Sequence, residues 1–244
     1  MKALCRKICR LCNKEVDLQN SHIIPNFVYR PIYAEHLAQG VKHPAYELFR
    51  EGMDLFGAKR KIIQTGLNEK LLCRQCEQLL NDNYEKYFHQ LWFKQKTLPE
   101  ITPPGFAIHL SGLDYPKFKL FHLSILFRAS VSSLPEFSQV DLGPHENTIR
   151  GMLLDNNPGR ESEYVILAHT VTSDDHKINF NLITSPFKTR QPNGSISYGF
   201  CFGGCAWYYI VDSHPVMEYS KFMLKLDGTM SLMSLDRDSF LDWK

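Results

Sequence analysis

Two Cys-x-x-Cys pairs are the residues of this 244-residue chain whose type and spacing specify chemistry most clearly. The first pair is Cys9 and Cys12, and the second is Cys73 and Cys76. Four thiolates in two such pairs are typical of a structural zinc ion in tetrahedral sulfur coordination. A zinc ion held in this way would join two segments that are distant in the sequence. It would also fix the position of the polar residues that lie between them.

The other three cysteines are weaker candidates for metal ligands. Cys5 is close to Cys9, but the two-residue spacing of Cys9 and Cys12 fits a zinc knuckle better. Cys201 and Cys205 lie in a glycine-rich, aromatic context, and we interpret them as small buried residues.

A histidine lies between the two cysteine pairs, in the segment Ser-His-Ile-Ile-Pro at residues 21–25. Histidine titrates close to neutral pH, so His22 is a candidate general base. The alternative is a structural role. The β-branched neighbours Ile23 and Ile24 favour a strand, in which a buried histidine would cap the knuckle.

Taken in order, these motifs resemble the HNH endonuclease family. Family members with a zinc knuckle contain a Cys-x-x-Cys, a strand with an acidic residue followed by His-Ile-x-Pro, an Asn, and a Leu-Cys-x-x-Cys that leads into a helix. The corresponding elements here lie between about residue 5 and residue 90, with Asn68 and Leu72 at the last two places. The resemblance implies a ββα-metal unit made of two strands and a helix.

The resemblance also implies roles for individual residues. His22 would be the general base that activates water for phosphodiester hydrolysis, and Asn68 would orient it and hold the loop. The places of the ligands for one catalytic divalent ion, magnesium or manganese, fall on Ser21, Glu77 and Asn81. Glu77 and Asn81 are four residues apart, so we expect them to share a helix face.

Two positions depart from the family pattern. Ser21 stands where the family has an acidic residue, and Glu77 stands where it has a histidine, although this glutamate can restore the charge that Ser21 lacks. The departures favour an alternative function, a catalytically inactive zinc-stapled module that binds nucleic acid or protein. In that case Asn68 is a turn residue after Gly66, and Glu77 is a favourable acidic residue in the first turn of a helix.

Charge and hydropathy restrict the possible partners and compartment. The net charge of +2 is too small to indicate nucleic-acid binding, but five basic residues lie within residues 2–14. No apolar run approaches the roughly 20 residues that a membrane span requires, so we expect no membrane partner. The N-terminus has no apolar signal core, and we expect the cytoplasm, where paired cysteines bind metal more often than they form disulfides.

Hydrophobic patterns divide the chain into two parts at the proline-rich segment 97–105. Residues 1–100 would form the HNH-like zinc-knuckle domain, which ends with an amphipathic helix after Cys76. Residues 105–244 would form a second domain with helices at 117–133 and 145–154. Strands are predicted at 164–171, 178–184, 195–202, 206–211 and 221–226. We therefore expect an α+β fold, with helices packed on an antiparallel sheet.

The resemblance predicts a metal-dependent endonuclease that acts on DNA, with zinc in a structural role and magnesium or manganese in a catalytic one. An HNH unit contacts phosphates rather than base edges, so the second domain would supply recognition or regulation. A partner protein such as an ATPase would bind this second half. The architecture is also similar to that of bacterial HNH proteins, some of which serve as nuclease components of anti-phage defence systems.

Overall fold

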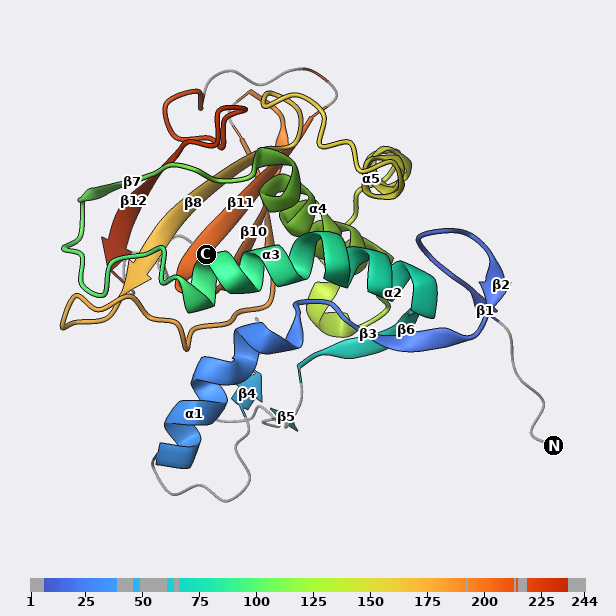
Figure 1. Cartoon of the computed structure of the whole chain (residues 1–244), viewed down its shortest axis with the longest axis horizontal. Coiled ribbons are helices and arrows are strands. Elements are labelled where there is room, and N and C mark those ends of the chain that lie inside the picture. The colour runs from blue at the N-terminus through green and yellow to red at the C-terminus, as the bar shows by residue number, and fades with distance from the viewer. Residues whose placement is uncertain are drawn as a thin grey trace.

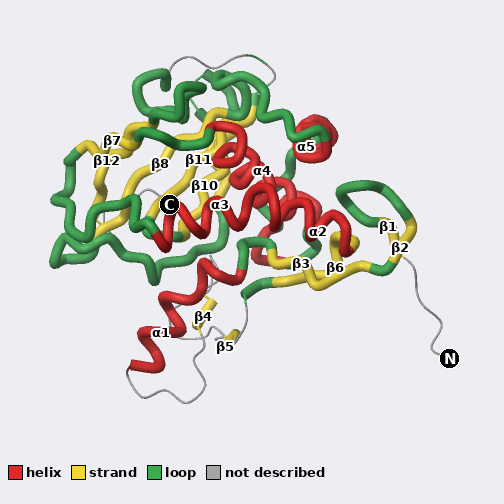
Figure 2. Tube along the Cα trace, viewed as in Figure 1, coloured by secondary structure: helices red, strands yellow, loops and turns green. Residues whose placement is uncertain are grey.

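The computed structural model describes residues 7–38, 46–48, 61–63, 66–191, 193–212, 214 and 219–236. Helices and strands are both abundant, which confirms the predicted α+β class (Figures 1 and 2). Among these residues, no helix combines the length and apolar character that a membrane crossing needs.

The N-terminal part contains two small antiparallel strand pairs, which lie next to a helix. Strands β1 (Lys7–Ile8) and β2 (Glu15–Val16) pair with each other and enclose the turn that carries the first cysteine pair. Strand β3 (Leu18–His22) pairs with β6 (Asn68–Cys73), and β6 continues directly into helix α2 (Arg74–Leu80). Figure 1 shows both pairs beside α2, so two strands and a helix together carry most of the predicted site residues.

The chain between β3 and β6 leaves this strand pair and forms four further elements. It contains the 3₁₀ turn η1 (Asn26–Tyr29), helix α1 (Arg30–Ala38) and a short antiparallel pair of strands, β4 (Tyr46–Leu48) and β5 (Lys61–Ile63). Figure 1 shows that α1 extends away from the large sheet. The chain between His22 and Asn68 is therefore placed to one side of the strand pair that carries these two residues.

Helix α2 begins a continuous helical run that ends at residue 94. It continues as the π-helical turn η2 (Asn81–Glu85), the short helix α3 (Lys86–Phe88) and a second π-helical turn, η3 (His89–Lys94). The buried side chains of this run recur at every fourth position, at Leu80, Tyr84, Phe88 and Trp92. A four-residue repeat would drift around an α-helix of 3.6 residues per turn. The wider π turns reduce that drift and keep the four side chains on one buried face.

A six-stranded sheet forms the second half of the fold, in the order β7-β12-β8-β11-β10-β9. Its strands are β7 (Ala107–Leu110), β8 (Val165–Thr172), β9 (Phe187–Arg190), β10 (Ile196–Phe202), β11 (Cys205–Val211) and β12 (Met230–Asp236). The prediction of a purely antiparallel sheet is wrong at one pair, because β12 lies parallel to β8. The chain crosses over after β11 and returns beside β8 in the same direction, which produces a parallel pair.

Two of the predicted strands are also absent from this sheet. Residues 178–184 contribute only an isolated bridge, between Thr172 and Ile178, and residues 221–226 form turns and irregular chain. Both segments contain apolar residues, but they lack the regular cross-strand partners that a sheet requires.

Helix α4 (Tyr115–Val131) packs against both the helical run and the sheet, and it is buried along most of its length. Its N-cap is Asp114, whose side chain accepts a hydrogen bond from the Lys117 backbone N–H. The rings of Phe88 and Phe121 stack at 3.9 Å, and the Trp92 indole N–H donates to the Gly203 carbonyl at 2.8 Å. The 3₁₀ turn η4 (Pro135–Phe137) and helix α5 (His145–Leu154) follow. One buried cluster thus extends from the helical run to the sheet.

Candidate metal centre and adjacent polar cluster

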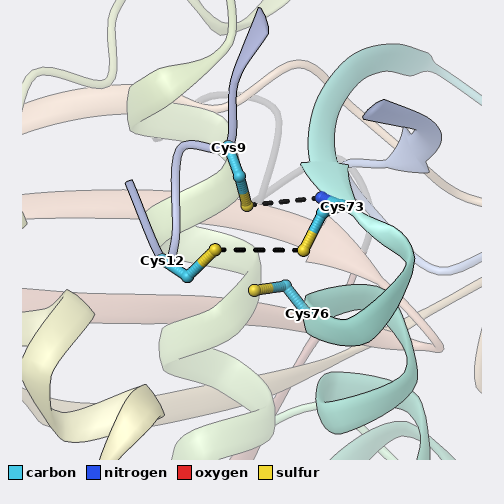
Figure 3. Close-up of side chains that lie close together, drawn as sticks. All are labelled: Cys9, Cys12, Cys73 and Cys76. Carbon is cyan, nitrogen blue, oxygen red and sulfur yellow. Dashed lines mark hydrogen bonds between the residues drawn. The ribbon is translucent and has the colours of Figure 1, made fainter. Parts of the chain in front are cut away.

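The four predicted zinc ligands converge at one end of the N-terminal strand pairs. The sulfur atoms of Cys9, Cys12, Cys73 and Cys76 all lie within 4.8 Å of one another, and Figure 3 shows the four side chains pointing toward a common centre. A tetrahedral site with zinc–sulfur bonds of about 2.3 Å needs sulfur atoms about 3.8 Å apart. The Cys12 and Cys73 sulfur atoms are 3.9 Å apart. The cluster can therefore hold a metal ion such as zinc.

Backbone hydrogen bonds shape the first cysteine pair. The Cys9 N–H donates to the Lys14 carbonyl at 2.9 Å, and the Asn13 N–H donates to the Cys9 carbonyl at the same distance. Asn13 has a φ of 58°, a left-handed conformation that asparagine tolerates better than most residues. The resulting tight turn points both thiols to one side. The Arg10 N–H, which donates to the Leu71 carbonyl at 3.0 Å, ties this turn to β6.

The environment of the Cys9 sulfur favours a thiolate. The Cys73 backbone N–H donates to the Cys9 sulfur at 3.3 Å, a contact that stabilises negative charge on sulfur. A hydrogen bond with the Cys76 thiol lowers the pKa of Cys9 to about 4, against the opposing effect of burial. The same hydrogen bond raises the pKa of Cys76. Deprotonated thiols are the form that binds metal.

Cys201 and Cys205 take no part in this cluster. Cys201 and Cys205 are buried in the sheet, and the Cys201 thiol lies 3.7 Å from the Leu182 carbonyl. Cys5 is outside the described residues.

His22 and Asn68 occupy opposite positions in the register of β3 and β6. The Asn68 amide donates to the Gly66 carbonyl at 2.9 Å and so holds the chain that enters β6. Gly66 has no side chain and so leaves room for the rings of Tyr29 and His22. A Cβ at this position would lie 2.5 Å from the Tyr29 ring and 3.2 Å from the imidazole of His22.

Ser21 is part of β3, and Glu77 lies beside it in α2. Ser21 is fully buried, and its hydroxyl oxygen accepts a hydrogen bond from the Leu72 backbone N–H at 3.1 Å. Glu77 lies in the first turn of α2, and its Oε1 atom is buried without a hydrogen-bond partner in the described part of the chain. Burial raises the pKa of Glu77, although the charge of Arg128 and the Ser21 hydroxyl oppose that effect. An oxygen of this kind is available to a ligand.

Asn81 differs from the other predicted ligands in its surroundings. It is exposed, and its side-chain amide donates to the Asp82 carboxylate at 3.2 Å. Helix α2 ends at Leu80, and the π-helical turn begins at Asn81. The described contacts of Asn81 therefore do not connect it with Glu77, Ser21 or His22.

Two charged residues that the sequence reasoning missed lie next to the candidate site. Arg128 comes from α4 and pairs with Glu85 of the helical run at 2.9 Å. The Arg128 side chain also donates from Nε to the Ser124 carbonyl at 3.2 Å. The sequence did contain a signal for this pair. An arginine within the strongly apolar run 117–133 has to find a charged or polar partner when its helix is buried.

Electrostatic effects connect these charged residues with the predicted site. Burial lowers the pKa of His22, the Arg128 charge lowers it further, and the Glu85 charge raises it. Arg128 and Glu85 have the same opposing effects on Glu77. We call Ser21, His22, Glu77, Glu85 and Arg128 the polar cluster. It contains a neutral histidine, a Glu77 oxygen that has no hydrogen-bond partner among the described residues, and an arginine that pairs with Glu85 inside the cluster.

No protein-family model, curated protein or solved structure shows a significant match to the chain. The cysteine cluster and the polar cluster are therefore the features of the chain that indicate a function.

Proposed function

We propose that the protein is a metal-dependent endonuclease of the HNH type, stabilised by a structural zinc ion at the four cysteines. The observation that supports this proposal is the cross-strand pairing of His22 with Asn68, in a strand pair whose Ser21 lies beside Glu77. The strands β3 and β6 and helix α2 carry these residues and also lead into the cysteine cluster. The order of these elements supports the proposal of a zinc-stapled ββα-metal unit.

His22 would act as the general base. A general base has to be unprotonated before it can take a proton from water, and burial keeps the pKa of this imidazole below its ordinary value. The activated water would then attack the phosphorus atom of the scissile phosphodiester. Asn68 would hold the start of β6 in position through its side-chain hydrogen bond to the Gly66 carbonyl, and so keep His22 in place on the paired strand.

Glu77 would be the main ligand of the catalytic divalent ion. Its buried Oε1 is a hard oxygen donor without a competing partner among the described residues, as magnesium and manganese prefer. When bound, such an ion supplies charge stabilisation and assistance to the leaving oxygen. The Ser21 hydroxyl lies beside Glu77 and remains a predicted neutral ligand, as does the amide of Asn81.

A local basic surface supports DNA as the substrate. Lys7 and Lys14 are exposed beside the turn that carries Cys9 and Cys12. Lys70 and Arg74 are exposed where β6 continues into α2. Cations at these positions would contact backbone phosphates of DNA without reading base sequence.

Plasmid cleavage tests the proposal directly. Purified protein would be incubated with supercoiled DNA and magnesium, manganese or a chelator, with His22→Ala and the exposed-site control His109→Ala in parallel. We expect metal-dependent nicking by the wild type and by His109→Ala. We expect a loss of about 100-fold or more for His22→Ala, which should keep its zinc. Unchanged cleavage by a folded His22→Ala variant would exclude the proposed mechanism.

A second candidate function is a zinc-stapled nucleic-acid-binding module without catalysis. The specific observation in its favour is Arg128, whose positive charge acts on Glu77 next to the place of the predicted divalent ion. Ser21 at the position of the family's acidic residue favours it as well. This function predicts DNA binding that weakens steeply with salt but no cleavage with any divalent ion. In that case Glu77→Gln should leave DNA affinity unchanged.

A further inference from the structure

A pocket of about 560 Å³ lies at the end of the helical run, next to α1. Its lining includes Pro31 of α1, Phe93 of η3 and Phe180 from the chain that follows β8. The Phe27 ring of η1 packs against the Phe93 ring, with the centroids 5.6 Å apart. Because η1 follows β3 closely in the chain, packed rings join the pocket to the segment next to His22.

Two half-buried rings form one wall of this pocket. The rings of Phe93 and Phe180 meet edge to face, with centroids 5.9 Å apart and planes at 62°. The wall rests on the turn Gly203–Gly204, where φ is positive at both residues. A Cβ at Gly204 would lie 2.5 Å from Ile178 and 3.5 Å from the Phe180 ring. The turn thus lets these side chains lie close to it, and they present an aromatic surface on which a flat ring system can stack.

Two lysines of the lining supply positive charge at the rim. Lys96 and Lys177 are both exposed. Lys96 has no ion-pair partner among the described residues, whereas Lys177 pairs with Asp175 at 2.7 Å. The side chains of that pair are 62% and 54% exposed, so the pair is weak and Lys177 can bind another anion instead. A phosphate group beside the rings would therefore meet two cations.

The acidic residue of the described lining is Glu100. Backbone hydrogen bonds hold its segment beside Lys177. The Ile178 N–H donates to the Glu100 carbonyl at 3.3 Å, and the Thr102 N–H donates to the His176 carbonyl at 2.9 Å. A carboxylate can accept a hydrogen bond from the exocyclic amino group of a base. The lining thus combines a stacking surface, two cations and an acceptor, which are the groups that recognise a nucleotide.

We propose that this pocket binds one unpaired nucleotide of the nucleic-acid substrate, with its base stacked on Phe180 and its phosphate at Lys96 and Lys177. The inference rests on the proposed function, which makes a nucleic acid the ligand. The volume of the pocket is within the range of sites for small organic molecules. A base enters such a pocket only when it is unpaired, in a single strand or after flipping out of a duplex. The substrate would therefore be single-stranded or locally opened DNA.

Fluorescence anisotropy of labelled DNA tests this assignment. A fluorescein-labelled single strand and a duplex of the same sequence would be titrated with the full chain in the presence of a chelator, so that cleavage does not interfere. We expect Phe180→Ala to weaken single-strand binding by about fivefold or more, because one base loses its stacking surface. Duplex affinity should change by less than about twofold, because paired bases cannot enter the pocket.

Two further variants separate stacking from folding and from exposed apolar surface. Phe180→Leu keeps most of the apolar volume but has no flat face, so it should fold as the wild type does and still lose single-strand affinity. Phe106→Ala, which removes an exposed ring outside the lining, should bind both DNA forms as the wild type does. Melting temperatures would be measured for all three variants.

Salt dependence provides a second readout. Lys96→Gln removes one predicted phosphate contact, so the slope of log affinity against log salt for the single strand should become shallower by about 0.7. Lys94→Gln is the matched control, because Lys94 is exposed at the end of the same helical run but outside the lining. Its slope should stay at the wild-type value.

The inference is overturned if Phe180→Ala and Phe180→Leu bind single strands as the wild type does, or if single-strand and duplex affinity fall equally. Equal changes of slope in Lys94→Gln and Lys96→Gln would also overturn it, because overall charge would then account for the binding. His22-dependent plasmid cleavage with unchanged binding by the pocket variants would leave the proposed function without this pocket. Pocket-dependent single-strand binding without any cleavage would reject the proposed function and retain the nucleotide site.

Discussion

Arg128 of α4 and Glu85 of the helical run form an ion pair, with Nη1 and Oε1 2.9 Å apart and only 1% of the arginine side chain exposed. The two residues come from opposite sides of the proline-rich segment 97–105. Their charges act on both His22 and Glu77. The helix of the second half therefore contributes directly to the electrostatics of the candidate site.

Removal of the carboxylate of this pair should destabilise the fold strongly. Glu85→Gln leaves the Arg128 guanidinium buried without its counter-charge, and we expect the free energy of unfolding to fall by about 3–5 kcal/mol. Urea denaturation followed by circular dichroism would measure it. Lys86→Gln is the matched control, because Lys86 pairs with Asp82 on the exposed side of the same run. Its midpoint should stay at the wild-type value, and an equal effect in both variants would contradict the importance of the buried pair.

Zinc content should depend on the four clustered cysteines alone. Cys73→Ser removes one of the four thiolates, and we expect the bound zinc to fall from one ion per chain to nearly none, with a lower melting temperature. Elemental analysis by plasma mass spectrometry measures the metal. Cys201→Ala, which changes a buried cysteine outside the cluster, should keep its zinc. Full zinc occupancy in Cys73→Ser would show that the metal is bound elsewhere.

Gly66→Ala should disturb the candidate site without removing the zinc. The new methyl group would overlap the Tyr29 ring at 2.5 Å and press on the His22 imidazole at 3.2 Å. We expect a loss of about 1–3 kcal/mol in stability, as is common for overpacking, together with reduced cleavage activity. Denaturation, zinc analysis and the plasmid assay would be measured on the same sample. Unchanged activity would mean that the position of His22 relative to Gly66 is irrelevant to function.

Acid should destabilise the protein through His122. This imidazole is completely buried, and burial holds its pKa well below the value of 6.5 that it has in the unfolded chain. Below about pH 6.5 the unfolded chain therefore binds more protons than the folded chain. The free energy of unfolding falls as the pH falls, by at most about 1.4 kcal/mol per pH unit for this one group.

Urea denaturation at pH 7 and pH 5.5 tests this prediction. His122→Gln should lose less stability between the two pH values than the wild type does. His214→Gln, which changes an exposed histidine, should behave as the wild type does. The same loss on acidification in all three proteins would assign the effect to other groups.

Local sequence patterns determined much of the secondary structure and the cysteine cluster. The predicted helices 117–133 and 145–154 correspond to α4 and α5, and the strand prediction 206–211 corresponds to β11. Such elements follow from hydrophobic periodicity, which acts over a few neighbouring residues. The spacing of the cysteine pairs likewise encodes a local turn, and convergence of the four thiols only requires that the two turns meet.

Only the tertiary structure decided which distant residues share a site. The sequence identified Glu77 as a ligand candidate, but it could not show that Arg128 lies close enough to affect it. The register that sets Asn68 opposite His22 also depends on long-range pairing. Pairing of this kind is set by the packing and desolvation of whole elements against one another. These energies arise between residues far apart in the chain and leave no local pattern to read.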